Sequence, residues 1–201
     1  NVNINDFDEI PLLHQAILRQ CTDAALFLLD QPSVDINAKS SMDNLTALQL
    51  AVKRHLPLVV ENLCKRGASM SVLDIEGNSP LWTALDTGQE DIASILVANR
   101  CDCAQWGPGP ENCQQTLLHR AIDENNDAVA VFLIKSGCDI NSPRRPGLNG
   151  EQPDEAKDKM TPLHLASSWG QEKVVSALVD QRTCQLNVQD FEGNTPLHLA
   201  I

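Results

Sequence analysis

The sequence predicts an all-α solenoid in which short helix-turn-helix units are joined by short β-hairpin loops. A six-residue motif of the form Thr-Pro-Leu-His-Leu-Ala recurs in six versions along the 201 residues, with intervals of 33 to 45 residues that are typical of repeat architectures. Aromatic residues make up only 3% of the chain, so the core must consist of Leu, Val, Ile and Ala, which suits short packed helices. The six motifs end at Ala16, Ala51, Ala84, Ala121, Ala166 and Ala200.

Each motif is expected to begin the first helix of a unit, as in the copy at residues 116–121. Thr116 can cap this helix by accepting a hydrogen bond from a free backbone N–H, and the Pro that follows in other copies suits a first helical turn. Asn125 stands four residues after the motif Ala, where Gly88 and Gly170 stand in other units. Both residue types tolerate the left-handed backbone of a tight turn, so each unit is predicted to contain two antiparallel helices.

The second helix of the same unit presents an apolar stripe from Val129 to Ile134 that a single unit cannot bury. Neighbouring units must therefore cover it. Gly137 is expected to end this helix, and the Asp-x-x-Gly-Asn runs at residues 74–78 and 190–194 are expected to form projecting turns before the next unit.

These motifs and their spacing resemble the ankyrin repeat over nearly the whole chain. The resemblance implies one array over residues 1–201, with about five complete repeats, one truncated repeat and an insertion loop at about 142–159. Neither end reads as a polar capping repeat, so we expect a segment of a longer array. The resemblance also implies that the motif His side chains bind backbone, and that the array binds proteins without a cofactor or catalysis.

Two further stretches, CDCAQWGPGPENCQQTLLHRAID and INSPRRPG, resemble the rabankyrin-type endosomal proteins, which join a BTB domain, ankyrin repeats and a FYVE finger. This resemblance implies a cytoplasmic scaffold on early endosomes that acts as an effector of an early-endosomal Rab GTPase in endocytic trafficking and macropinocytosis. Two other functions stay open at this point. One is a passive solenoid spacer, and the other is an accessory region of an enzyme such as a ubiquitin-ligase adaptor.

The composition narrows the classes of partner. Lys and Arg number 15 against 27 Asp and Glu, which gives a formal net charge of −12 and disfavours binding to nucleic acid. The sequence contains no apolar run of the roughly 20 residues that span a bilayer, so no direct membrane contact is expected from this segment. Seven Cys without paired spacing favour the reduced thiols of the cytosol over a disulfide framework.

In the ankyrin family, two residues near the end of each first helix face a concave groove that partners commonly use. Here these pairs give a basic start, an acidic middle and an aromatic end. A partner with an acidic element, then a basic one, then an apolar anchor would match this order, while a solvated face of mixed charge is the alternative. The candidate groove residues are Arg19, Lys53, Arg54, Asp86, Asp123, Glu124 and Trp169.

Two insertions supply further candidates for partner binding. The longer one is rich in Pro, Gly and charge, which predicts a mobile loop that is either a charged finger ordered by a partner or an insertion with no role. The shorter one holds a Trp beside two Gly-Pro steps, which is either a lid over a nearby helix or an exposed anchor. The candidate loop residues are Trp106, Arg144, Arg145, Glu151, Asp154 and Glu155.

Metal binding and catalysis are not expected from the sequence. Cys and His are the usual zinc ligands, but the repeat pattern assigns the Cys residues to packing and the motif His to a backbone hydrogen bond. The sequence has no glycine-rich phosphate loop and no G-x-S-x-G turn. The residues that a zinc site would require are Cys101, Cys103, Cys113 and His119.

Two asparagines are candidates for modification. Asn37 and Asn141 each follow a Leu by eight residues in an Asp-Ile-Asn turn. These turns resemble the ankyrin hairpins accepted by the asparaginyl hydroxylase of the oxygen-sensing pathway. The preference of Asn for such turns is a sufficient alternative explanation.

Overall fold

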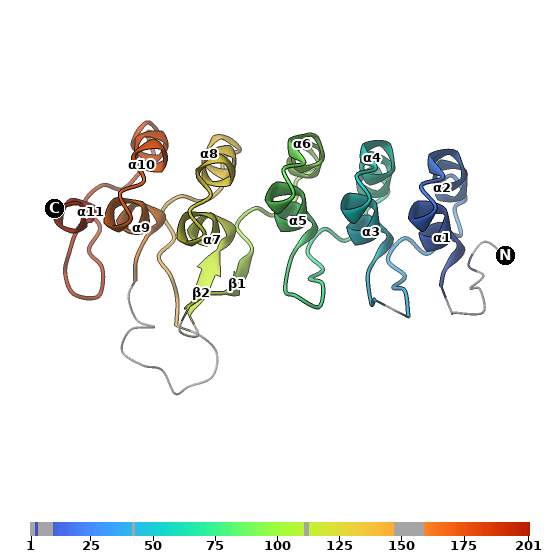
Figure 1. Cartoon of the computed structure of the whole chain (residues 1–201), viewed down its shortest axis with the longest axis horizontal. Helices are drawn as coiled ribbons and strands as arrows, with labels where there is room; N and C mark the ends of the chain where they lie inside the picture. Colours follow the sequence, from blue (N-terminus) through green and yellow to red (C-terminus); the bar gives the residue numbers. More distant parts are fainter. Residues whose placement is uncertain (1–2, 4–9, 42, 111–112, 147–158) are drawn as a thin grey trace. The chain divides into compact units, whose positions relative to one another are not determined.

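The computed structural model describes residues 3, 10–41, 43–110, 113–146 and 159–201. The chain divides into an N-terminal unit, Asn1–Asp102, and a C-terminal unit, Cys103–Ile201. Within each unit, a first helix is followed by an antiparallel second helix, and a hairpin loop leads to the next pair (Figure 1). The predicted architecture of helix-turn-helix pairs joined by hairpin loops is therefore confirmed within each unit.

The helices of the N-terminal unit are α1 (Leu12–Leu18), α2 (Thr22–Leu29), α3 (Ala47–Lys53), α4 (Pro57–Lys65), α5 (Pro80–Asp86) and α6 (Glu90–Ala98). The elements of the C-terminal unit are β1 (Trp106–Pro108), β2 (Gln114–Thr116), α7 (Leu117–Asp123), α8 (Asp127–Lys135), α9 (Pro162–Ser168), α10 (Glu172–Val179) and α11 (Pro196–Leu199). Odd-numbered helices are first helices, and even-numbered helices are second helices.

The motif begins each first helix through local hydrogen bonds. At the start of α3, the Gln49 backbone N–H donates to Thr46 Oγ1 over 3.3 Å, and the Thr46 backbone N–H donates to Gln49 Oε1 over 2.9 Å. The same position in α9 pairs the Thr161 backbone N–H with His164 Nδ1 at 3.2 Å. These reciprocal bonds satisfy backbone donors that a helix start leaves free, which is why the helices begin at the motif.

The turn after each first helix has a left-handed backbone at the predicted position. Gly88 has φ of +70° and Asn125 has φ of +55°. Gly and Asn adopt this conformation readily, and Gln20 and His55 hold the same position in the first two turns with φ of +56° and +52°. Three residues separate the first helix from the second in each pair, and the second helix packs back against the first.

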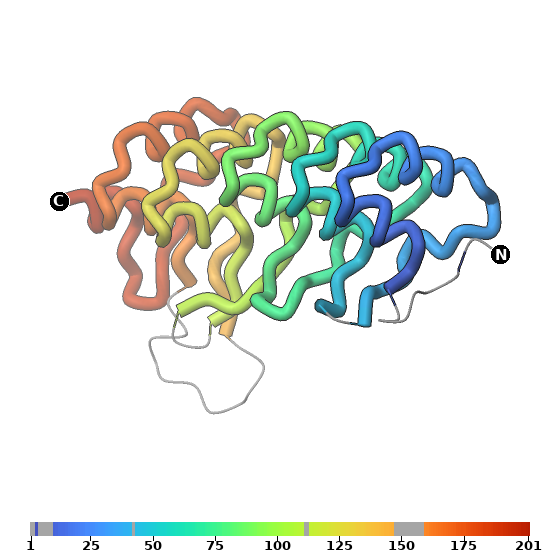
Figure 2. Tube along the Cα trace, turned by 45° about the vertical axis from the view of Figure 1, so that its right-hand side comes forward, coloured from blue at the N-terminus to red at the C-terminus, as the bar shows by residue number. Residues whose placement is uncertain are grey.

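Each unit has a continuous core because neighbouring pairs cover one another's apolar stripes. First helices α1, α3 and α5 contact in sequence in the N-terminal unit, as do α7, α9 and α11 in the C-terminal unit. Figure 2 traces these successive pairs along each unit. Leu48, Leu63 and Leu81 are fully buried in the first core, and Leu118 and Leu133 are buried in the second.

The motif histidines join one repeat to the hairpin before the next, as predicted. His14 Nε2 lies 3.0 Å from the Leu45 carbonyl oxygen, His119 Nε2 lies 3.1 Å from that of Met160, and His164 Nε2 lies 3.1 Å from that of Asn194. All three imidazoles are fully buried. In α3 the corresponding residue is a glutamine that bonds the Val72 carbonyl oxygen at 3.0 Å instead.

Candidate protein-binding surfaces

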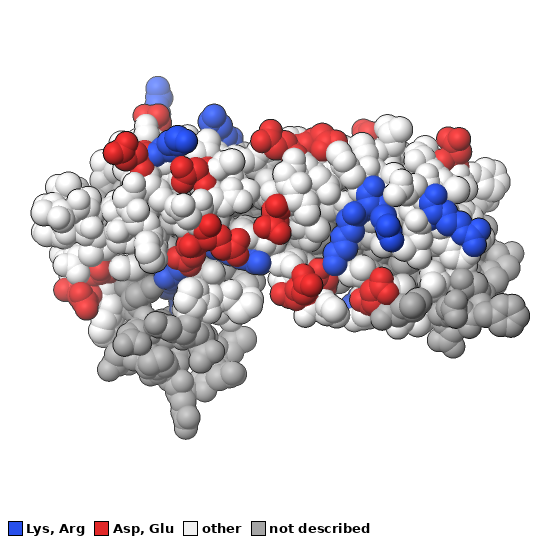
Figure 3. All heavy atoms as spheres, in the orientation of Figure 1, with Lys and Arg blue, Asp and Glu red and all other residues white. Residues whose placement is uncertain are grey.

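The N-terminal unit presents the predicted basic residues together. Arg19 and Arg54 are the residues that follow the last turns of α1 and α3, Lys53 is the last residue of α3, and Asp86 is the last residue of α5. All four are exposed. Figure 3 shows the Lys and Arg side chains gathered over α1 and α3. The ends of neighbouring first helices thus form one charged surface in this unit, which we call the N-terminal charged surface.

Lys53 is engaged within this surface. Its Nζ lies 3.1 Å from Asp74 Oδ2, and the Asp74 side chain is only 1% exposed. Burial is the largest influence on the pKa of Asp74 and raises it, but hydrogen bonds from the Asn78 backbone, Lys53 and the Glu76 backbone together hold this pKa below its usual value. Lys53 therefore helps to fix the projecting turn at residues 74–78 against α3.

The remaining charges of this surface are available. Arg19, Arg54 and Asp86 form no ion pair with any other described residue. Their side chains are solvated, so a partner can approach them without first breaking an internal contact.

In the C-terminal unit, the predicted acidic residues Asp123 and Glu124 form ion pairs with arginines of the same unit. Asp123, the last residue of α7, forms an ion pair with Arg144, which also donates to Gln115 Oε1 over 3.1 Å. Glu124 Oε1 accepts from Arg120 Nε at 2.9 Å. Of the three predicted acidic residues, Asp123 and Glu124 are therefore paired within the C-terminal unit, whereas Asp86 of the N-terminal unit is not paired with any described residue. The prediction that Arg144 lies in an exposed finger is wrong, because its side chain is only 8% exposed.

The base of the longer insertion continues a small sheet. Strands β1 and β2 are antiparallel, and Arg145 pairs with Gln114 through two backbone hydrogen bonds of 2.7 and 3.0 Å. The Arg144 backbone N–H donates to the Met160 carbonyl oxygen over 2.9 Å. Both ends of the insertion are thus held beside β2, while the predicted acidic residues Glu151, Asp154 and Glu155 lie outside the described residues.

Trp106 occupies a position between the two alternatives that the sequence left open. Its ring is half-buried in β1, and the exposed Arg145 guanidinium lies 3.9 Å from the ring centroid. A cation over an aromatic face is an attractive contact. Trp106 and Arg145 therefore form a stacked pair at the foot of the insertion.

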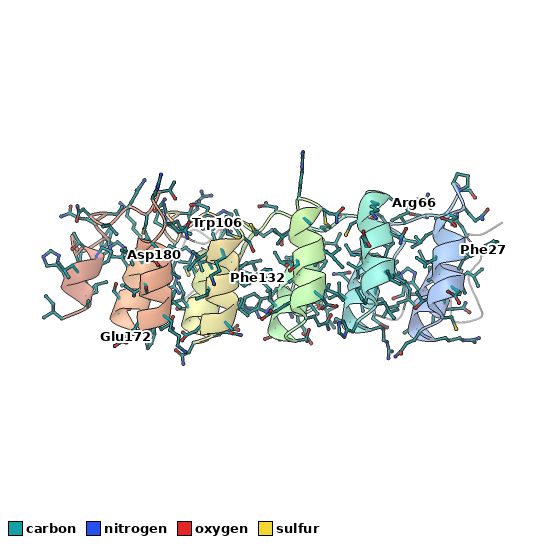
Figure 4. The ribbon with its side chains drawn as sticks, turned by 90° about the horizontal axis from the view of Figure 1, so that it is seen from above. Phe27, Arg66, Trp106, Phe132, Glu172 and Asp180 are labelled. Atoms are coloured by element: carbon teal, nitrogen blue, oxygen red, sulfur yellow. The ribbon has the colours of Figure 1, made fainter. Side chains whose placement is uncertain are left out.

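Exposed apolar side chains add to these surfaces. Trp169, which follows α9, is 64% exposed. Phe27 on α2 is 66% exposed, and Figure 4 shows it on the second-helix side of the unit. The sequence did not single out Phe27, although its run Leu-Phe-Leu-Leu has more apolar residues than one buried stripe needs. Ile75, at the tip of the turn at residues 74–78, is 82% exposed.

The two candidate asparagines hold adjacent hairpins together. Asn37 Oδ1 accepts from the Ser69 backbone N–H at 2.9 Å, and Asn141 Oδ1 accepts from the Gln185 backbone N–H at 2.9 Å. Asn141 Nδ2 also donates to the Thr183 carbonyl oxygen over 2.9 Å. These contacts give each Asn a structural role, and hydroxylation of either residue stays a prediction.

The chemistry of His119 is that of a structural residue. Burial first, and then the charge of Arg144, lowers the pKa of His119 to about 3, so its imidazole is neutral. Burial likewise raises the pKa of the Cys64 thiol to about 11.

In the described part of the chain, no group of three or more His, Cys, Asp or Glu side chains is placed to hold a metal ion. No helix among the described residues is both long and apolar enough to cross a membrane.

Comparison with known proteins agrees with the fold. A family model described as ankyrin repeats (3 copies) matches residues 13–107, 48–144 and 147–201. Among solved structures, an ankyrin repeat domain from Acinetobacter baumannii has a TM-score of 0.68 at 21% identity, covering 94% of this chain and 89% of its own. The ankyrin repeat domain of Bcl-3 has a TM-score of 0.58 at 18% identity, covering 94% of this chain and 93% of its own. At these identities the likeness concerns the fold alone.

Curated relatives include a closer sequence match over part of the chain. Rabankyrin-5 of Homo sapiens is 61% identical over 101 residues, and Rabankyrin-5 of Mus musculus is 59% identical over 105 residues. These alignments cover 50% and 52% of this chain, and 9% of the length of each relative. The p105 subunit of nuclear factor NF-kappa-B from Gallus gallus is 28% identical over 94% of this chain and 18% of its own length.

Proposed function

Because the chain belongs to the ankyrin-repeat family, we propose that it is a protein-interaction scaffold within an early-endosomal Rab GTPase effector of endocytic trafficking and macropinocytosis. The observation that carries the endosomal part is the identity of 59 to 61% with Rabankyrin-5 over about half the chain. The chain spans less than a tenth of those relatives, so the proposal concerns the role of this segment within a longer protein.

The scaffold role is supported by the surfaces described above. The N-terminal charged surface offers Arg19, Arg54 and Asp86, and the C-terminal unit offers the exposed Trp169 and the stacked pair of Trp106 and Arg145. Large aromatic and arginine side chains are the residue types that most often carry binding energy at protein interfaces. We propose these two surfaces as the ones that engage partners.

Binding to GTPase-coated beads tests the Rab-effector proposal. An early-endosomal Rab GTPase is immobilised in its GTP-analogue form and, in parallel, in its GDP form, and the purified chain is passed over both. We expect retention on the GTP-analogue form only, and weaker retention of the Trp169→Ala variant. Lys65→Glu is the control, because Lys65 pairs with Glu61 on the second helix α4, away from the first-helix ends.

Equal retention on the two nucleotide forms, or none on either, would overturn the Rab-effector proposal. The scaffold proposal has a separate test, in which partners captured from cytosol are compared for wild type, Trp169→Ala and Arg145→Ala. If every captured protein is unchanged in both variants and also in Arg54→Glu, which alters the N-terminal charged surface, both proposed surfaces are wrong and the segment acts as a spacer.

A further inference from the structure

A Ser-Pro-Arg-Arg run at residues 142–145 stands just before the longer insertion. Proline-directed protein kinases modify a Ser or Thr that precedes Pro, and one class of them also requires a basic side chain at the third position after the modified residue. Ser142 meets both requirements, because Pro143 follows it and Arg145 stands at the third position. The sequence of this run therefore fits a phosphorylation site.

Three other Ser-Pro or Thr-Pro pairs occur in the chain, but the fold uses them in another way. Each begins with the N-cap residue of a first helix, whose side chain bonds the start of that helix. The residues that follow are helical, and the third position holds Trp or His instead of Lys or Arg. These pairs begin at Ser79, Thr161 and Thr195.

The segment around Ser142 has the form that a kinase can bind. Residues 142–144 belong to no helix or strand, and a residue before Pro favours an extended backbone. Pro143 and Arg145 are exposed, whereas the Arg144 side chain between them is buried and paired with Asp123. The two side chains that the kinase recognises therefore face solvent, and the one that it does not recognise anchors the segment.

The Ser142 hydroxyl belongs to a turn that Asp139 holds. The hydroxyl donates to Asp139 Oδ2, and the backbone N–H groups of Asn141 and Ser142 donate to Asp139 Oδ1 over 2.9 and 3.3 Å. Burial is the largest influence on the pKa of Asp139 and raises it, but these hydrogen bonds hold the pKa below its usual value. The turn is thus built around a charged carboxylate.

The matching turn of the N-terminal unit forms without a hydroxyl. There the Asn37 backbone N–H donates to Asp35 Oδ1 over 3.1 Å, and Ala38 stands at the place of Ser142. The fold therefore does not require a hydroxyl at this position. Ser142 is half-buried, so its hydroxyl is not enclosed in the core.

We propose that Ser142 is phosphorylated by a proline-directed protein kinase, and that the phosphate opens the turn at residues 139–142. Ser142 Oγ attacks the γ-phosphorus of ATP and forms a new O–P bond, while the bond from this phosphorus to the departing ADP oxygen breaks. The hydroxyl proton passes to the catalytic base of the kinase. The inference goes beyond the proposed scaffold function and does not depend on it.

The opening of the turn follows from charge. A phosphoserine carries about −1.5 to −2 charge near pH 7, so it repels the Asp139 carboxylate that the hydroxyl formerly bonded. Asn141 lies in the same turn and bonds the backbone of Thr183 and Gln185 in the next hairpin. Phosphorylation should therefore loosen the contact between these two hairpins.

Kinase treatment of the full chain tests the site. The purified chain is incubated with ATP and a proline-directed kinase of the class that requires a basic residue at the third position, and the products are mapped by mass spectrometry. We expect one phosphate per chain, on Ser142, which Ser142→Ala abolishes and Arg145→Ala slows about tenfold or more. Ser136→Ala is the matched control, because Ser136 is also half-buried in this unit but precedes Gly.

A synthetic peptide of residues 139–146 separates the effect of sequence from that of the fold. Comparable rates for the peptide and the folded chain would support the site. Modification of the peptide alone would show that the fold shields Ser142, and modification of neither would show that the run is no substrate. Either result would overturn the proposal, as would preferred modification of Ser79, Thr161 or Thr195.

Hydrogen exchange of the modified chain, followed by NMR, tests the opening of the turn. The Asn141 and Ser142 backbone N–H groups should exchange at least about tenfold faster after phosphorylation. Ser142→Ala removes the hydroxyl without adding charge and should change exchange far less. In Asp139→Asn the repelled charge is absent, so phosphorylation should accelerate exchange little. Unchanged exchange in the phosphorylated chain, or an equal rise in Ser142→Ala, would reject a turn opened by charge.

Discussion

The two units place charge at the same position of the first helix and use it in opposite ways. In the N-terminal unit, Arg54 and Asp86 are exposed and form no ion pair with other described residues. In the C-terminal unit, Asp123 is paired with the buried Arg144, and Glu124 is paired with Arg120. Apart from Lys53, which pairs with Asp74, charges at these places are thus solvated in the N-terminal unit and belong to the internal structure in the C-terminal unit. A charge at a repeat position therefore indicates a binding surface only where the structure shows that it forms no internal ion pair.

Removal of Arg144 should give the largest effect. Arg144→Met leaves the Asp123 carboxylate and the Gln115 amide without their buried partner, so we expect the free energy of unfolding to fall by about 3 kcal/mol. The matched change in the other unit, Arg54→Met, should alter it by less than about 0.5 kcal/mol, because that side chain is exposed. Urea denaturation of both variants, followed by circular dichroism, measures the difference.

A second substitution controls for the lost packing of the Arg144 side chain. Adding Asp123→Asn to Arg144→Met removes the unpaired charge and should restore a large part of the lost stability. Equal costs for Arg144→Met and Arg54→Met would contradict the comparison between the units.

The next effect in size is a dependence of stability on pH. The pKa of His119 is lowered to about 3 in the folded protein, whereas an unfolded His has a pKa near 6.5. The unfolded chain therefore binds more protons at acidic pH, so stability is fully present above about pH 6.5 and is lost as the pH falls toward 3. This residue alone should cost about 2 kcal/mol between about pH 7 and pH 5.

His119→Gln is the matched control for that titration, because Gln49 already performs the same task in α3 of the N-terminal unit. The variant keeps a donor for the Met160 carbonyl oxygen but cannot titrate. Urea midpoints from about pH 7 to pH 5 should fall more steeply for wild type than for His119→Gln. Burial also lowers the pKa of His14, so some acid sensitivity remains in the variant. Identical slopes would show that His119 does not carry the effect.

The repeat could be predicted from sequence because its determinants are local. The cap at Thr46, the left-handed turn at Asn125 and the His119 bond to backbone each follow from residue type at a fixed offset within the motif. The places of Arg19 and Trp169, directly after their first helices, follow from the same offsets. Periodicity thus specifies which residues lie at the ends of the first helices.

The pairing of those residues could not be predicted in the same way. Arg144 stands in an insertion that has no counterpart in the other units, and its path beside β2 depends on the hydrogen bonds of Arg145 with Gln114 and of Arg144 with Met160. The charged, Pro-rich composition around Arg144 predicts an exposed loop. The ion pair with Asp123 joins residues 21 positions apart, which no motif offset reports.

The smallest effect distinguishes the two units most clearly. The same Asp→Asn substitution should raise the free energy of unfolding in one unit and lower it in the other. Asp86→Asn removes an unpaired acid from the C-terminal end of α5, so it should raise the free energy of unfolding by about 0.5 kcal/mol. Asp123→Asn makes the same change at the same place in α7, but it takes the charged partner from Arg144 and should lower stability. Urea denaturation of the two variants under one buffer condition gives both signs. A gain of stability in Asp86→Asn would show that no internal partner offsets this charge in the N-terminal unit. A loss of stability in Asp86→Asn would instead assign this residue a structural partner and remove it from the N-terminal charged surface.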